Sequence, residues 1–169
     1  MPIITEVGHV RRALEFFNRK GKFFCVGQQS PWEDEGYPPA PSFNSTTVNQ
    51  VLGYKAVSQV HLVVPDNVAG TIQYGSTKLR IVTPQNALSE KAKWVYVDAS
   101  LDSDELPIGE YRQVALFSGL QRKVGVAAGK LALLPSEVES EGILEVLDNK
   151  KVTKRALNQK EMLKFLIQF

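Results

Sequence analysis

The chain has 169 residues, of which 43% are hydrophobic and 22% charged, and a formal net charge of +2. This composition is that of a folded protein, and the small charge gives no support for a nucleic-acid or membrane-surface partner. No apolar run approaches the roughly 20 residues that cross a bilayer as a helix. The length indicates a single soluble domain over residues 1–169. Cys25 is the one cysteine and lies in an apolar strand, so we predict that it is a small buried core residue. No signal peptide is recognisable, and we expect the protein to be made in a reducing cytoplasm.

One α-helix is predicted at the start of the chain, over residues 3–20. The apolar residues that recur at helical spacing, and would form its buried stripe, are Ile3, Val7, Val10, Leu14 and Phe17. Thr5 is of the type that caps a helix N-terminus, and Gly21 is of the type that stops a helix. The pattern therefore predicts an amphipathic helix packed on the rest of the chain.

Stiffness and aromatic content mark the loop predicted over residues 28–50. Its four prolines favour an extended path, and they are Pro31, Pro38, Pro39 and Pro41. Trp32 and Tyr37 add large amphipathic rings, which are common at protein interfaces. Two interpretations stay open for Trp32, which either contacts a partner or plugs the core beneath its own loop.

Short strands separated by turn residues account for the rest. They are predicted over residues 22–26, 59–64, 71–74, 79–82, 94–97, 111–118, 125–128, 143–147 and 162–169. In the last one, Leu163, Phe165, Ile167 and Phe169 share one face, which predicts that the strand is built into a sheet. The spacing indicates a mainly β fold, an antiparallel β-sandwich or barrel over residues 51–169 with one N-terminal α-helix.

Metal-binding patterns are weak. Asp98, Asp102, Asp104 and Glu105 could in principle hold a hard cation, but their spacing lacks the glycine and final glutamate of a calcium loop. We interpret them as a solvated loop after a strand. His9 and His61 are the only histidines, and neither lies beside another ligand type at metal spacing, so no metal site is predicted.

Catalytic patterns are weak too. The stretch Gly125–Lys130 lacks the spacer and the hydroxyl residue of a phosphate-binding loop, and Cys25 has no evident histidine partner. We therefore predict no catalytic residue and no cofactor, and expect that the protein is not an enzyme.

Three blocks of sequence follow one another in the order of a known family. The first, residues 12–32, leads from the end of the helix through an apolar strand to a Pro-Trp turn. The second, residues 94–116, contains the run Tyr111-Arg112-Gln113, and the third, residues 141–169, ends in an aromatic strand. Together they resemble the gene product eight family, the small all-β baseplate wedge subunits of T-even-type contractile phages. The chain would be a shortened member, because residues 42–79 stand where fuller members carry a long insertion.

The resemblance implies a structural virion protein of the tail baseplate, assembled in the host cytoplasm. Such a protein would form a homodimer within the wedge and bridge other wedge and tail proteins, with no metal, cofactor, small-molecule substrate, nucleic acid or membrane partner. The residues expected at its partner interface are Pro31, Trp32, Tyr37, Pro38 and Pro39, with Tyr111, Arg112 and Gln113 as a second set. Two alternatives stay open: another tail or head–tail adaptor or completion protein, and a small β-barrel that binds nucleic acid.

Overall fold

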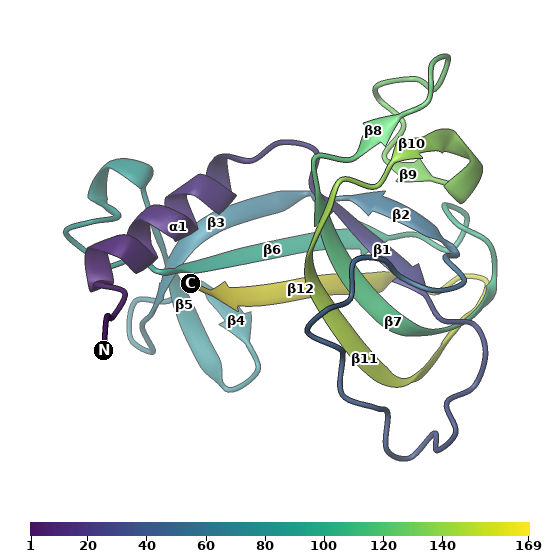
Figure 1. The fold of residues 1–169 in the computed structure, drawn as a ribbon, viewed down its shortest axis with the longest axis horizontal. Coiled ribbons are helices and arrows are strands. Elements are labelled where there is room, and N and C mark those ends of the chain that lie inside the picture. Colours follow the sequence, from purple (N-terminus) through teal and green to yellow (C-terminus); the bar gives the residue numbers. More distant parts are fainter. The chain divides into compact units, whose positions relative to one another are not determined.

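The computed structural model of the chain describes residues 1–169, and it is mainly β with one α-helix (Figure 1). The chain divides into two compact units. The helical unit comprises Met1–Arg19, Ser58–Asp98 and Lys164–Phe169, and the loop unit comprises Lys20–Val57 and Ala99–Leu163. A single domain over residues 1–169 stays a prediction.

The helical unit carries helix α1 and one antiparallel sheet. Its elements are α1 (Glu6–Asn18), β3 (Gln59–Pro65), β4 (Ile72–Tyr74), β5 (Thr77–Val82), the short 3-10 helix η1 (Pro84–Asn86), and the greater parts of β6 (Trp94–Leu101) and β12 (Glu161–Gln168). The strand order is β12-β6-β3-β5-β4, and β3 pairs antiparallel with both β5 and β6. This mainly β, antiparallel architecture with one N-terminal helix confirms the predicted fold class. No helix in the structure is both long enough and apolar enough to cross a membrane.

Helix α1 is shorter than predicted and turns a different face inward. Thr5 is its N-cap, as expected, and its Oγ1 accepts a hydrogen bond of 3.2 Å from the amide of Gly8. The buried residues are Val10, Ala13 and Phe16, and α1 packs against β3 (Figure 1). The predicted stripe is therefore wrong at Ile3 and Val7, which are 85% and 53% exposed. Ile3 precedes the helix, and small Ala13 lets the backbone approach the sheet on the face that becomes buried.

The end of the chain is built into the helical unit, as the sequence predicts. The ring of Phe169 lies 5.2 Å from that of Phe16, and the Phe169 amide donates a hydrogen bond of 3.0 Å to the carbonyl of Lys93. Within β12, Leu163 is buried, and Leu166, on the opposite face, packs against the core cluster of Val63, Leu79 and Tyr96. Both faces of the last strand therefore bury apolar surface, rather than one face alone.

The loop unit carries a second antiparallel sheet. Its elements are β1 (Phe23–Gly27), β2 (Gly53–Ala56), β7 (Gly109–Ser118), β8 (Gln121–Arg122), β9 (Ala132–Leu133), the 3-10 helix η2 (Pro135–Glu137), β10 (Val138–Ser140) and β11 (Ile143–Arg155). Five of them form a sheet in the order β11-β7-β1-β2-β9, while β10 pairs with β8. The strand predicted over residues 125–128 is wrong, because this segment is a turn in which Gly125 has a φ of +92°.

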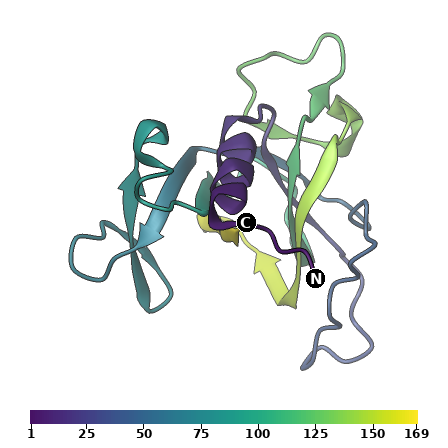
Figure 2. The ribbon, with the colours of Figure 1, turned by 60° about the vertical axis from the view of Figure 1, so that its left-hand side comes forward.

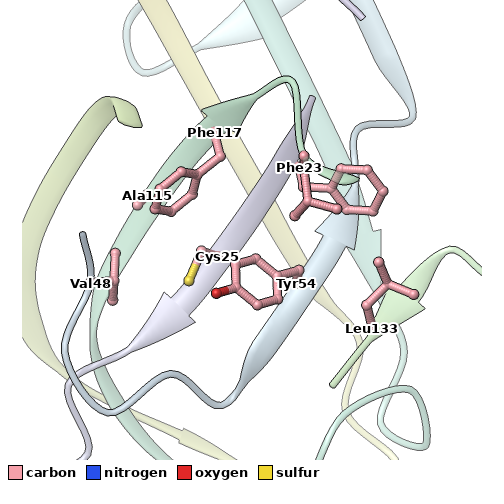
Figure 3. Close-up of a cluster of buried hydrophobic side chains, with 8 residues drawn as sticks. Phe23, Cys25, Val48, Tyr54, Ala115, Phe117 and Leu133 are labelled. Carbon is pink, nitrogen blue, oxygen red and sulfur yellow. The ribbon is translucent and has the colours of Figure 1, made fainter. Parts of the chain in front are cut away.

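A cluster of apolar side chains forms the core of the loop unit (Figure 3). Its buried members are Phe23, Cys25, Val48, Tyr54, Ala115, Phe117, Leu120 and Leu133. Cys25 is fully buried, which confirms its prediction as a small core residue, and burial raises the pKa of its thiol. Val48 belongs to the irregular segment between β1 and β2, so this core also anchors the long loop.

Removal of residues 165–169 is expected to abolish cooperative unfolding. The deletion uncovers Phe16 and takes Leu166 from its core, and burial of such side chains contributes roughly 1.5–3 kcal/mol each to a total stability of about 5–15 kcal/mol. Thermal denaturation followed by circular dichroism tests this, with the exposed substitution Gln168→Ala in the full-length chain as control. A soluble deletion variant that melts cooperatively near the wild-type temperature would contradict it.

Candidate protein-interaction site

The site is the irregular segment over residues 28–52, which joins β1 to β2 and is named here the proline loop (Figures 1 and 2). Backbone hydrogen bonds close its base: the Gln28 amide donates to the carbonyl of Asn49 at 2.6 Å, and the Leu52 amide to that of Val26 at 2.8 Å. A Cβ on Gly27 would lie 2.5 Å from a methyl carbon of Val48. Glycine therefore lets the two ends of the loop pass in contact.

Three polar side chains join the loop's two limbs. The Ser30 amide donates to Oε1 of Gln50 at 2.7 Å, and Nε2 of Gln50 donates to the Ser30 hydroxyl at 2.8 Å. Nε2 of Gln29 also donates to the carbonyl of Gln50 at 3.1 Å. The entry and exit of the proline loop are thus hydrogen-bonded to each other as well as to the sheet.

Arg112, from β7, holds the proline loop against the sheet with a buried charge. Its side chain is 3% exposed; Nε donates to the two carboxylate oxygens of Glu35 at 2.7 and 3.0 Å, and Nη1 to the carbonyl of Gln29 at 2.5 Å. Nη2 lies 3.0 Å from Oε2 of Glu110. These partners offset the loss of water around the guanidinium, and the hydrogen bonds that it donates to Glu35 raise the pKa of Arg112.

A second set of contacts fixes the loop to β11. The indole Nε1 of Trp32 donates to the carbonyl of Lys150 at 2.9 Å, and Nδ2 of Asn149 donates to the carbonyl of Pro39 at 3.0 Å. Nε2 of Gln113 donates in turn to Oδ1 of Asn149 at 2.8 Å, which orients the Asn149 amide. The loop is therefore attached to two neighbouring strands of one sheet.

The structure thus brings the two sets of predicted interface residues together, in different surroundings. Tyr111, Arg112 and Gln113 are buried, at 2%, 2% and 7% exposure. Arg112 contacts the loop directly, and Gln113 contacts it through Asn149. The Tyr111 hydroxyl instead donates a hydrogen bond to Glu161 at 3.3 Å. Within the loop, Pro31 and Pro39 are exposed, Trp32 and Pro38 half-buried, and Tyr37 is 84% exposed.

Three residues of the candidate site are not predicted from the sequence: Glu35, Asn149 and Phe43. Phe43 is fully exposed, at 102%, and stands on the same loop as Tyr37. One signal for Glu35 was available, because residues 28–52 contain three carboxylates and no Lys, Arg or His. A carboxylate in such a segment can form an ion pair within the protein only with a cation from elsewhere in the chain. Nothing in the sequence pointed to Asn149.

The predicted acidic loop is organised by cations of the chain itself. Nη2 of Arg155, a buried residue, donates to the carbonyl of Asp102 at 3.1 Å, and its Nε to that of Pro107 at 3.2 Å. Glu105 is paired with Lys55. Asp98 is buried within β6 and lies outside this loop. The interpretation as a solvated loop is therefore incomplete, and the structure contains no group of three or more His, Cys, Asp and Glu residues able to hold a metal ion.

Fold and site together define a mainly β protein that carries an ordered, aromatic surface loop. Over residues 1–169 the chain matches the family described as baseplate wedge 3 tail fiber network component, and it belongs to that family. It is 34% identical over 173 aligned residues to Virion protein 3 of Enterococcus phage phiEF24C, with 99% of this chain and 94% of that protein covered.

The predicted role as a structural component of a phage baseplate is confirmed at the level of the family. Membership of the gene product eight family, with residues 42–79 as a shortened insertion, stays a prediction. So do the homodimer and the contractile character of the tail.

Replacement of Arg112 by Lys should loosen the proline loop. Lysine keeps the charge but cannot make the forked contacts with Glu35, Glu110 and the Gln29 carbonyl, so we expect a loss of about 2–3 kcal/mol in the free energy of unfolding. Urea denaturation measures this loss, and limited proteolysis should cut within residues 28–52 faster than in wild type. Lys154→Gln, which removes an exposed partner of Glu110, is the control; an unchanged cleavage rate in the Arg112 variant would count against the clamp.

The ion pair of Glu110 should give the protein a pH-dependent stability. Arg112, and then Lys154, lower the pKa of Glu110 from its ordinary 4.5. A carboxyl group whose pKa is lower in the folded state stabilises the protein above its unfolded pKa, and this contribution is lost as the pH falls through the folded value. Wild type should therefore exceed Glu110→Gln in melting temperature at about pH 7, and the difference should shrink steadily below about pH 4.5. Glu139→Gln, an exposed control, should show no such trend; a constant difference for Glu110→Gln would refute the assignment.

Proposed function

We propose that this protein is a structural connector of the baseplate wedge that binds neighbouring baseplate or tail proteins through its proline loop. One observation carries the proposal: Tyr37 is 84% exposed on a segment whose base is fixed by buried Arg112. An exposed aromatic ring on a stiff segment loses little conformational freedom when it docks, and Tyr is enriched among residues that dominate binding energy.

A hollow beside the loop supports the same proposal. It has a volume of about 330 Å³, and its lining residues are Pro41, Ser42, Phe43 and Ser45 from the loop and Leu144, Glu145, Val146 and Leu147 from β11. Phe43 stands at this hollow with its ring exposed. A partner could therefore place an apolar side chain in the hollow while it packs on the aromatic rings of the loop.

Within the predicted interface we propose different roles for different residues. Tyr37 is the proposed anchor, with Phe43 as a second exposed ring, and Pro31, Pro38 and Pro39 stiffen the loop. Trp32, Arg112 and Gln113 support the loop from within, because their polar atoms bind other parts of the chain. Tyr111 is buried beneath and takes no direct part.

The finer parts of the proposal concern assembly. We propose that the chain forms a homodimer within the wedge of a contractile tail and is assembled in the host cytoplasm, and that its role is mechanical rather than catalytic. The three sequence blocks shared with the gene product eight family support these points. The match of residues 1–169 to a baseplate family favours this role over a head–tail adaptor or a small nucleic-acid-binding barrel.

Tyr37→Ala should fold normally and fail to assemble. Substitution of so exposed a side chain changes stability by no more than about 0.5 kcal/mol, or about 2 °C in melting temperature. Loss of an interface anchor weakens binding by about 2 kcal/mol or more, which is at least about tenfold. The measurement is the amount of the chain in tails purified from cells that supply only the variant, with Val124→Ala, at an equally exposed position of another loop, as the control. Wild-type incorporation of Tyr37→Ala would remove the proline loop from the interface.

A further inference from the structure

The sign of the charge around the exposed aromatic rings indicates what kind of partner the proline loop fits. Residues 28–52 contain Glu33, Asp34 and Glu35 and no Lys, Arg or His, in a chain whose net charge is +2. Arg112 neutralises Glu35 from beneath. Glu33 and Asp34 are both exposed, and neither forms a salt bridge in the structure. The exposed part of the loop therefore carries two negative charges without a salt-bridge partner in the structure.

These two charges lie on the same turn as the proposed anchor. The Tyr37 amide donates to the carbonyl of Asp34 at 3.3 Å, and Oδ1 of Asp34 accepts a hydrogen bond of 2.8 Å from the Gly36 amide. These two bonds hold Asp34 and Tyr37 at the two ends of one turn, and Glu33 directly precedes Asp34. Any surface that covers Tyr37 must therefore come close to both carboxylates.

We infer that the proline loop docks on a different baseplate or tail protein, at an apolar recess for Tyr37 rimmed by Lys or Arg side chains. This inference rests on the proposed docking function and adds the chemistry of the partner. A surface without cations at the rim would remove water from Glu33 and Asp34 and leave them unpaired, which opposes binding. A cationic rim pairs with them, steers the approach of the two proteins and rejects partners of the wrong charge.

The test uses purified chain and partially assembled baseplates from cells infected with a phage in which the gene for this chain carries a stop codon. The double variant Glu33→Gln/Asp34→Asn removes both charges and keeps an oxygen at position 34 to accept the bond from Gly36. The matched control, Glu139→Gln/Asp104→Asn, removes the same two residue types at exposed positions elsewhere in the loop unit that form no salt bridge.

At about 50 mM salt the double variant should bind roughly fivefold more weakly than wild type, mainly through slower association, because two exposed ion pairs are lost and exposed pairs are individually weak. The difference should nearly vanish at about 1 M salt, where charges are screened beyond about 3 Å. The control variant should bind as wild type does. Unchanged or tighter binding by the double variant, or an equal loss in the control, would overturn the cationic rim.

Tyr37→Ala, measured on the same particles, separates this inference from the function on which it rests. If Tyr37→Ala loses binding and the double variant does not, docking stands and the charge inference fails. If Tyr37→Ala binds normally, or the wild-type chain does not bind, the docking function fails and the inference with it. Sedimentation of the isolated chain tests whether the loop instead binds a second copy of this chain. Self-association that weakens in both Tyr37→Ala and the double variant would show this and contradict the inference.

Discussion

One buried cation, Arg112, binds the longest irregular segment of this protein through the Glu35 carboxylate and the Gln29 carbonyl. Arg112 sits on a central part of β7, where its guanidinium has almost no access to water, and it needs acceptors on several sides. Two carboxylates and one carbonyl supply them, and two of these three groups, Glu35 and the Gln29 carbonyl, come from the proline loop. The stability of the sheet and the shape of the loop are therefore coupled, because the buried charge stays satisfied only while the loop lies in place.

The same device recurs at a second loop of the same unit. Arg155, at the end of β11, is as deeply buried and binds the carbonyls of Asp102, Leu106 and Pro107, together with the carboxylate of Glu161. Neither irregular segment has a helix or strand of its own, so its backbone groups need partners from outside. An arginine fork supplies several donors at once, which suits a virion component whose surface loops must keep one shape in contact with neighbours.

Local sequence patterns predicted most helices and strands, but they predicted less well which side chains are buried and what those side chains contact. Thr5, Cys25 and the final strand follow from rules that act over a few residues, and the structure agrees with each. The face of α1 could not be read in this way, because it depends on the close approach that Ala13 permits to a strand more than forty residues away. The strand predicted over residues 125–128 rested on the apolar content of this segment, which forms a turn instead. Arg112 and Gln113 are predicted at an interface from the run Tyr111-Arg112-Gln113, and this stays a prediction. Their long-range partners Glu35 and Asn149 could not be predicted from local sequence.

The attachment of the proline loop to β11 has a consequence for solubility during assembly. β11 is the outer strand of its sheet, and an outer strand presents unpaired backbone groups on which another chain can add a strand. The Trp32 indole donates a hydrogen bond to the carbonyl of Lys150, and the Asn149 side chain donates one to the carbonyl of Pro39. Proline-rich backbone, which lacks amide donors, therefore lies over this stretch of the edge. The loop thus covers part of an edge that would otherwise be open to the addition of a strand from another chain.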